Sequence, residues 1–132
     1  MNKILFTTEF ADVHGGGQAS LLLLLERLDR RKFSPVVMVP AEGEVAARAR
    51  SLTCEVRVFP LPRLRSGLPV LGAIWRLRLL LKAAGIALIH TDAPRSTFYA
   101  VCARIFLGIR LLWHIRTEKR DVYLDRFLEQ RV

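Results

Sequence analysis

Cysteine is scarce in this chain, and its placement excludes several kinds of site. Only Cys54 and Cys102 occur, and neither lies in a C-x-x-C spacing or in a His-rich stretch. This pattern supplies no set of zinc ligands, so we expect no metal site. We expect both residues to be buried, reduced thiols.

Long apolar runs are also missing. No segment approaches the ~20 apolar residues that span a bilayer, and the apolar stretch after Lys3 is too short for a signal peptide. We therefore expect a cytoplasmic protein, with peripheral attachment to the inner face of the cytoplasmic membrane as a further hypothesis. The 132 residues, of which 52% are hydrophobic, fit one domain with a substantial core.

Acidic residues are absent between positions 56 and 91, and the chain as a whole has 21 basic and 12 acidic side chains, a net charge of +9. Such an excess favours an anionic partner, such as phosphate, nucleic acid or an acidic membrane surface. The sequence contains no helix-turn-helix, RRM or KH signature, so we do not expect nucleic acid.

Short apolar runs alternate with helical patterns along the chain. The expected strands are residues 4–8, 35–39, 56–59, 86–90 and 111–115. The expected helices are residues 18–28, 44–52, 70–84, 93–107 and 119–131, the first apolar nearly all round and hence buried, and the proline-rich residues 60–69 are expected to contain no regular element. This order predicts an α/β fold: a doubly wound, Rossmann-like parallel sheet with helices on both faces.

Three consecutive glycines, Gly15, Gly16 and Gly17, stand between the first expected strand and helix. Glycine allows close backbone approach to a ligand, and the amides at a helix start favour phosphate or carboxylate. A full dinucleotide motif is absent because Ser20 replaces its last glycine and the second strand ends in Pro40, and no P-loop lysine follows. We expect an anion site here; a tight turn without a ligand is the alternative.

Ligands of doubly wound folds bind at the carboxyl ends of the strands. The segments that follow the expected strands include residues 8–17, 40–43, 90–95 and 114–117, and they contain all three histidines of the chain. His90 and His114 end neighbouring strands, and Arg116 could clamp a phosphate or carboxylate. Structural histidines and an ordinary surface arginine are the alternative interpretation.

The helix expected over 70–84 carries two apolar stripes. One, with Val70 and Leu77, should face the sheet. The other includes Leu71, Trp75 and Leu79 and is flanked by basic residues: Arg76, Arg78 and Lys82. An aromatic and apolar stripe with basic flanks fits a membrane surface or a protein partner; a solvated helix with a basic rim is the alternative.

Several pieces of the sequence, taken in order, are similar to one known family. They are K-I-L-F-T-T at 3–8, G-G-G-Q-A-S-L-L-L-L-L at 15–25, R-K-F-S-P-V-V-M-V-P at 31–40, A-L-I-H-T-D at 87–92 and L-L-W-H-I-R at 111–116. Through them the chain resembles the N-terminal half of a GT-B glycosyltransferase of the retaining family-4 type. The resemblance implies transfer of a hexosyl group from a nucleotide-sugar donor to a hydroxyl acceptor. The acceptor would be a sugar or a lipid-linked molecule, and the reaction would need no cofactor.

The resemblance also implies roles for individual residues. The loop of Gly15, Gly16 and Gly17 would lie near the donor phosphates and the acceptor, His114 would approach the transferred sugar as the catalytic residue, and His90 would line the acceptor side. Residues 1–132 would form an incomplete acceptor-side domain that lacks the C-terminal donor-binding domain with its E-x7-E motif, and would be inactive alone. A donor-binding subunit could replace that domain. The alternative function is a non-catalytic α/β module that binds a small phosphate ligand or a partner subunit.

Overall fold

The computed structural model describes residues 2–13 and 16–113. Its centre is a parallel five-stranded sheet in the order β3-β2-β1-β4-β5, as the alternating sequence pattern predicts. The strands are β1 (Asn2–Thr7), β2 (Phe33–Val39), β3 (Glu55–Val58), β4 (Ile86–Thr91) and β5 (Arg110–Trp113). In register, Phe6 of β1 lies opposite Val37 of β2 and His90 of β4.

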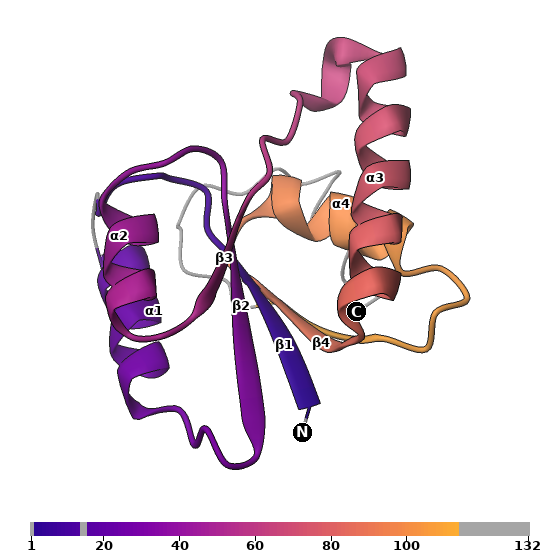
Figure 1. The fold of residues 1–132 in the computed structure, drawn as a ribbon. Helices are drawn as coiled ribbons and strands as arrows, with labels where there is room; N and C mark the ends of the chain where they lie inside the picture. The colour runs from indigo at the N-terminus through magenta and orange to yellow at the C-terminus, as the bar shows by residue number, and fades with distance from the viewer. Residues whose placement is uncertain (1, 14–15, 114–132) are drawn as a thin grey trace.

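Helices cover both faces of the sheet (Figure 1). They are α1 (Gly16–Arg27), α2 (Glu44–Ser51), α3 (Leu68–Ala84) and α4 (Pro94–Ala103), with a short 3₁₀ helix, η1 (Leu64–Ser66), before α3. Helices α1 and α2 lie on one side of the sheet, and α3 and α4 lie on the other. The doubly wound fold is thereby confirmed over the described residues.

Alternating side chains of each strand divide the core into two clusters. Leu5 of β1 packs with Leu77 and other residues on the α3/α4 side, whereas Phe6 packs with Leu25 on the α1/α2 side. The central strands are apolar on both faces, as expected for a parallel sheet that helices cover twice. Burial of each such aliphatic side chain is worth about 1.5–3 kcal/mol.

The prediction of no regular element over residues 60–69 is wrong at its end. Residues Leu64–Ser66 form η1, and α3 already begins at Leu68. Pro69 lies in the first turn of α3, where its missing N–H and fixed φ suit a helix start. Gly85 ends α3 as expected: it adopts the left-handed conformation, and its amide bonds back to the last turn.

The helix expected over 93–107 is shorter than predicted. Helix α4 ends at Ala103, and turns follow to Gly108. Phe106 has a φ of 62°, which ends any helical run, and Gly108 has a φ of 69°. Arg78 of α3 donates hydrogen bonds to the carbonyl oxygens of Ala103 (3.2 Å) and Ile105, and so satisfies one carbonyl at the helix end and one just after it.

Helix α1 is not buried all round, contrary to the expectation from its leucine run. Leu21, Leu22 and Leu25 are buried, but Leu23 and Leu24 are 47% and 39% exposed. Only one face of a helix at the side of a sheet can contact that sheet, so a run of five leucines must leave part of itself in solvent.

Cys54 and Cys102 are not joined by a disulfide bond. Cys54 is buried, as expected, and Cys102 is only half-buried. Arg30 holds Cys54 in place, because its guanidinium donates to the Sγ atom (3.2 Å) and to the carbonyl oxygen of Leu52 (2.7 Å). Among the described helices, none has the length and apolar character needed to span a bilayer. The helix expected over 119–131 lies outside the described residues.

Candidate site at the carboxyl edge of the sheet

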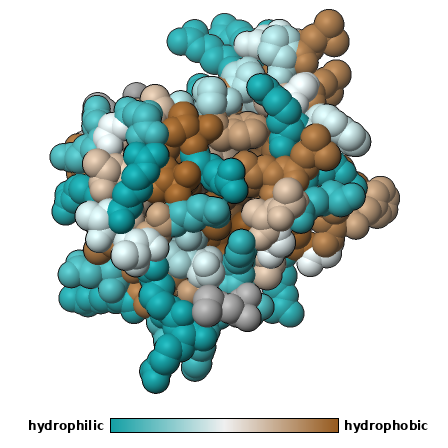
Figure 2. Space-filling model, in the orientation of Figure 1, coloured by the Kyte–Doolittle hydropathy of each residue, from teal (hydrophilic) through white to brown (hydrophobic). Residues whose placement is uncertain are grey.

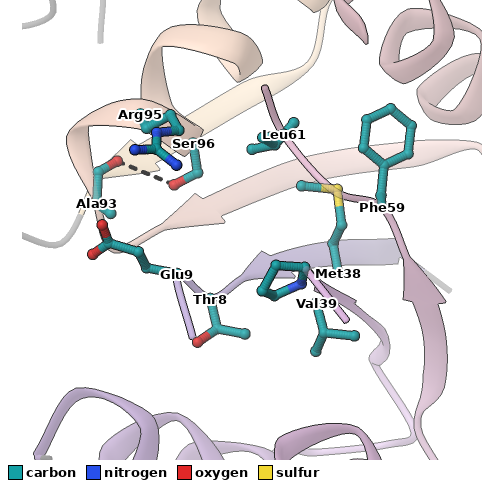
Figure 3. Close-up of a pocket in the computed structure, with 10 residues that line it drawn as sticks. Thr8, Glu9, Met38, Val39, Phe59, Leu61, Ala93, Arg95 and Ser96 are labelled. Carbon is teal, nitrogen blue, oxygen red and sulfur yellow. Dashed lines mark hydrogen bonds between the residues drawn. The ribbon is translucent and has the colours of Figure 1, made fainter. Parts of the chain in front are cut away.

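A pocket lies where the carboxyl ends of β1, β2 and β3 meet the start of α4 (Figure 3). Its volume is about 50 Å³, room for one small chemical group of a larger ligand. The lining residues are Thr8, Glu9, Met38, Val39, Pro40, Phe59, Leu61, Ala93, Arg95 and Ser96. The position agrees with the expectation that ligands of such folds bind beyond the strand ends.

One side of the pocket is polar. Glu9, Arg95 and Ser96 lie there, with Ala93 close by (Figure 3). Glu9 and Arg95 are exposed, so a ligand can reach both charges. Ser96 is buried, and its hydroxyl donates to the carbonyl oxygen of Ala93 (3.1 Å). A carboxylate, a guanidinium and a hydroxyl together can bind the hydroxyl groups of a polyol or one anionic group.

The other side of the pocket is apolar. Met38 and Phe59 lie there, and Leu61 closes the upper side in Figure 3. The guanidinium of Arg76 from α3 lies 5.7 Å from the centre of the Phe59 ring, within the range of a cation–π contact. An apolar wall facing a polar one suits a ligand with a hydrophobic face and a hydroxylated edge, such as a sugar ring.

The start of α4 is fixed by side-chain hydrogen bonds. Thr97 is buried, and its hydroxyl contacts the Thr91 hydroxyl and the carbonyl oxygen of Ala93, both at 2.7 Å. The amide of Thr97 donates to the same carbonyl at 3.0 Å. Because Thr91 ends β4 and Ala93 precedes α4, these bonds set the position of the helix start, and with it Arg95 and Ser96.

Tyr99 anchors the chain segment over the pocket. Its side chain is fully buried in α4, and its hydroxyl donates a 2.5 Å hydrogen bond to the carbonyl oxygen of Pro62. Burial raises the pKa of the Tyr99 hydroxyl, while the charge of Arg95 acts weakly in the opposite direction. The segment that carries Phe59 and Leu61 is therefore tied to α4.

The segment after β1 accepts hydrogen bonds from the first amides of α2. The amides of Glu44 and Val45 donate to Asp12 Oδ1 (3.0 Å) and to the carbonyl oxygen of Ala11 (2.9 Å). In return, Glu44 Oε1 accepts a hydrogen bond from the Val13 amide (3.1 Å). Residues 40–43 therefore precede a helix start whose first two amides already have partners.

Only some of the site residues that the sequence predicts lie within the described residues. Gly16 and Gly17 form the first turn of α1 rather than a turn before it. His90 is 7% exposed and contacts the Phe6 ring at a centroid distance of 5.3 Å. It does not line the pocket, because Ile89 packs on the α3/α4 side and the next residue of a strand faces the other way. Gly15, His114 and Arg116 lie outside the described residues.

The second apolar stripe predicted on helix α3, Leu71, Trp75 and Leu79, is here called the outer stripe of α3, and it is exposed. Trp75 is 61% exposed, and Leu71 and Leu79 are 64% and 48% exposed. The basic residues beside it are not equally free to meet a partner, since Arg76 lies over Phe59 and Arg78 binds carbonyl oxygens of the α4 end. Lys82 is exposed.

Glu9, Arg95 and Tyr99 belong to the site, and sequence reasoning did not select them. A signal for Arg95 was present: Pro94 at a helix start directly after a strand places Arg95 in the first turn, at the carboxyl edge. Nothing local to Tyr99 indicated its contact with Pro62, which is 37 residues away in the chain.

Comparison with known proteins agrees with the fold. Residues 15–132 match the family described as Glycosyl transferase 4-like domain. The chain therefore belongs to this glycosyltransferase family. No curated protein matches the chain.

Several solved structures share the fold. A glycosyltransferase from Rickettsia africae aligns with a TM-score of 0.73 at 12% identity, covering 96% of this chain and 33% of its own. Anabaena HepE in complex with UDP and glucose aligns with 0.72 at 18% identity, covering 97% and 34%. Acinetobacter baumannii MurG aligns with 0.76 at 11% identity, covering 100% and 40%. The chain thus spans between a third and two fifths of the length of these GT-B glycosyltransferases.

Proposed function

We propose that this chain forms the acceptor-side domain of a glycosyltransferase that moves a sugar from a nucleotide-sugar donor to a hydroxyl acceptor. The observation that carries the proposal is the pocket at the carboxyl edge, which sets Glu9 and Arg95 opposite an apolar wall that includes Phe59. The family supports the reaction class, and a neighbour in fold, HepE, has been crystallised with UDP-glucose.

In this proposal the pocket holds part of the acceptor. The bond between the sugar's anomeric carbon and the donor's diphosphate breaks, and a new bond forms from that carbon to the acceptor oxygen, whose proton is released. Glu9 and Ser96 would bind neighbouring acceptor hydroxyls, and Arg95 would orient the acceptor at the start of α4. A volume of about 50 Å³ admits one group, so the remainder of the acceptor would extend along the edge of the sheet.

The residues first selected from the sequence complete the proposal on the donor side. Amides around Gly15, Gly16 and Gly17 would steady the charge of the leaving diphosphate. His114, which directly follows the last residue of β5, would hydrogen-bond the transferred sugar, and Arg116 would bind phosphate. We propose a retaining hexosyl transfer in the cytoplasm, with a second domain or subunit that binds the donor.

A non-catalytic module is the second candidate, because the small volume and the arginine at the start of α4 also suit a single phosphate group. The two functions differ in what the pocket binds. Only if the module is correct should inorganic phosphate raise the melting temperature of the chain in a way that Arg95→Ala abolishes.

The test of the transferase is a sugar-transfer assay with the protein translated from the source's whole reading frame. Arg95→Ala should lower transfer ~10–100-fold because the acceptor is no longer oriented. Arg48→Ala is the matched control: Arg48 is also an exposed helix arginine, but it lies on α2 outside the pocket. Equal activity of the two variants would contradict the proposed acceptor site.

A further inference from the structure

Residues 8–13, which follow β1, form part of the pocket and lead to the glycine run at the start of α1. Thr8 and Glu9 line the pocket. The beginning of this segment is held by β2, since the Thr8 amide donates to the carbonyl oxygen of Met38 (3.3 Å). The Thr8 hydroxyl donates to the carbonyl oxygen of Phe10 (3.3 Å) and so closes a bend around Glu9.

The end of the same segment is held by α2 through a reciprocal pair of side chains. Asp12 Oδ1 accepts a hydrogen bond from the Glu44 amide (3.0 Å), and Glu44 Oε1 accepts one from the Val13 amide (3.1 Å). The carbonyl oxygen of Ala11 accepts a third bond, from the Val45 amide (2.9 Å). Asp12 and Glu44 are 32 residues apart in the sequence, so these bonds join two separate parts of the chain.

Helix α2 takes its amino-terminal cap from this segment. The residue before the helix is Gly43, which has no side chain that could accept a hydrogen bond. Asp12 supplies the carboxylate that a capping residue would supply, and Glu44 completes an arrangement like a capping box whose two members come from different segments. A Cβ added at Gly43 would lie 2.8 Å from Asp12 Oδ1, so the small size of glycine allows the segment to approach.

This contact lies at the surface and is supported by the core beneath it. Asp12 and Glu44 are exposed, and hydrophilic side chains are abundant on the side of the molecule where α1 and α2 lie (Figure 2). Val45 is fully buried, and Val13 packs against the same apolar cluster. Apolar packing holds the two segments together without preferring one direction, whereas the hydrogen bonds depend on direction and so fix how the segments are aligned.

We propose that Asp12 and Glu44 are positioning residues for the site at the carboxyl edge. Thr8 and residues 11–13 hold the segment on both sides of Glu9, and so they determine where its side chain enters the pocket. Asp12 and Glu44 do not line the pocket themselves, so they act through the segment rather than on a ligand. This inference rests on the proposed function and adds a residue of α2 to the machinery of the acceptor site.

The first test measures transfer kinetics with the protein translated from the source's whole reading frame. Asp12→Ala and Glu44→Ala should each lower kcat/KM for the acceptor ~10–100-fold, because Glu9 no longer meets the acceptor hydroxyls in the right place. Asp12→Asn and Glu44→Gln should retain most of the activity, since each keeps a side-chain oxygen that accepts the same hydrogen bond. Arg50→Ala is the matched control: its two bonds to Glu42 (2.6 and 2.7 Å) join α2 to the loop before it.

A second measurement, on the 132-residue chain, does not depend on sugar transfer. In Asp12→Ala the amide NMR signals of Glu9 and Phe10 should shift together with those of the first residues of α2, whereas in Arg50→Ala they should stay in place.

Two results would overturn the inference. One is a set of NMR changes in Asp12→Ala that is confined to α2, because the pair would then only cap that helix. The other is a kcat/KM in Asp12→Ala and Glu44→Ala equal to that of Arg50→Ala. Absence of transfer by the wild-type protein would instead count against the proposed function, and the NMR result would then decide whether Asp12 and Glu44 order the pocket lining.

Discussion

The hydroxyl of Tyr99 donates a 2.5 Å hydrogen bond to the carbonyl oxygen of Pro62. This bond connects α4 with the segment that leaves β3, forms the apolar wall of the pocket and leads into α3. The pocket and the outer stripe of α3 therefore share one support. A change at Tyr99 should affect both the stability of the domain and the order of the pocket wall.

Tyr99→Phe should lower the free energy of unfolding by about 1 kcal/mol. The ring remains in the core, and the loss is limited to one hydrogen bond and an unpaired carbonyl group. Urea denaturation measures the change. Tyr99→Ala should cost about 3–5 kcal/mol, because it also leaves a cavity in the core cluster. Equal effects of the two substitutions would show that the hydrogen bond, rather than the packed ring, dominates.

Stability should fall at alkaline pH. Burial raises the pKa of the Tyr99 hydroxyl and of the Cys54 thiol, and both groups are neutral when protonated. Above their ordinary values of about 10 and 8.5 the unfolded chain loses these protons more readily than the folded chain does. Their contribution is therefore complete below those values and disappears as the pH rises through the raised pKa values of the folded state.

The contribution of Tyr99 to this pH dependence can be separated. Between neutral pH and about pH 11, the denaturation midpoint of Tyr99→Phe should fall less than that of the wild-type chain, since phenylalanine cannot ionise. An identical fall in both proteins would assign the alkaline effect to other groups.

Gly43 and Gly72 should respond in opposite ways to alanine. At Gly43 an added Cβ would lie 2.8 Å from both the carbonyl oxygen of Ala11 and Oδ1 of Asp12, the acceptors for the start of α2. Gly43→Ala should destabilise the domain by about 1–3 kcal/mol. At Gly72, inside α3, an added Cβ meets no atom within 4 Å, so Gly72→Ala should stabilise by about 0.5–1 kcal/mol. Thermal unfolding of the pair tests this, and a loss of stability in Gly72→Ala would contradict it.

Arg78→Ala should destabilise the contact between α3 and α4. The substitution leaves the carbonyl oxygens of Ala103 and Ile105 without this donor, at a cost of about 1–2 kcal/mol because the site is partly exposed. Arg65→Ala, at an exposed position of η1, should change the free energy of unfolding by less than about 0.5 kcal/mol. A comparable loss in both variants would show that net charge, rather than the hydrogen bonds, is responsible.

Much of the fold follows from local sequence signals. Apolar runs of strand length alternate with helical patterns, and Gly85 marks the end of α3 correctly. The predictions are wrong where contacts between residues far apart in the sequence determine the structure. The carbonyl oxygen of Ala103 at the end of α4 is bound by Arg78, 25 residues away, and the exposure of Leu23 and Leu24 depends on how much of α1 the sheet can cover.

Fewer of the site residues than of the helices and strands could be predicted from the sequence. The strand ends located its region, but the lining depends on residues that distant contacts bring together, such as Phe59 and Arg95. His90 ends a strand as expected, yet strand alternation directs it to the face opposite the pocket. The periodicity of the sequence can predict that a residue lies on a strand. Whether its side chain reaches the pocket depends on which pair of helices packs against that face of the strand.

The most direct test of the central claim compares the 132-residue chain alone with the protein translated from the source's whole reading frame. Both are assayed for transfer of a labelled sugar from nucleotide-sugar donors to hydroxyl acceptors. The proposed function predicts transfer by the whole-frame protein and no transfer by the chain alone, because it assigns only the acceptor side to this chain. Transfer by the isolated chain at ordinary enzyme rates, or no transfer by the whole-frame protein with any donor, would contradict it.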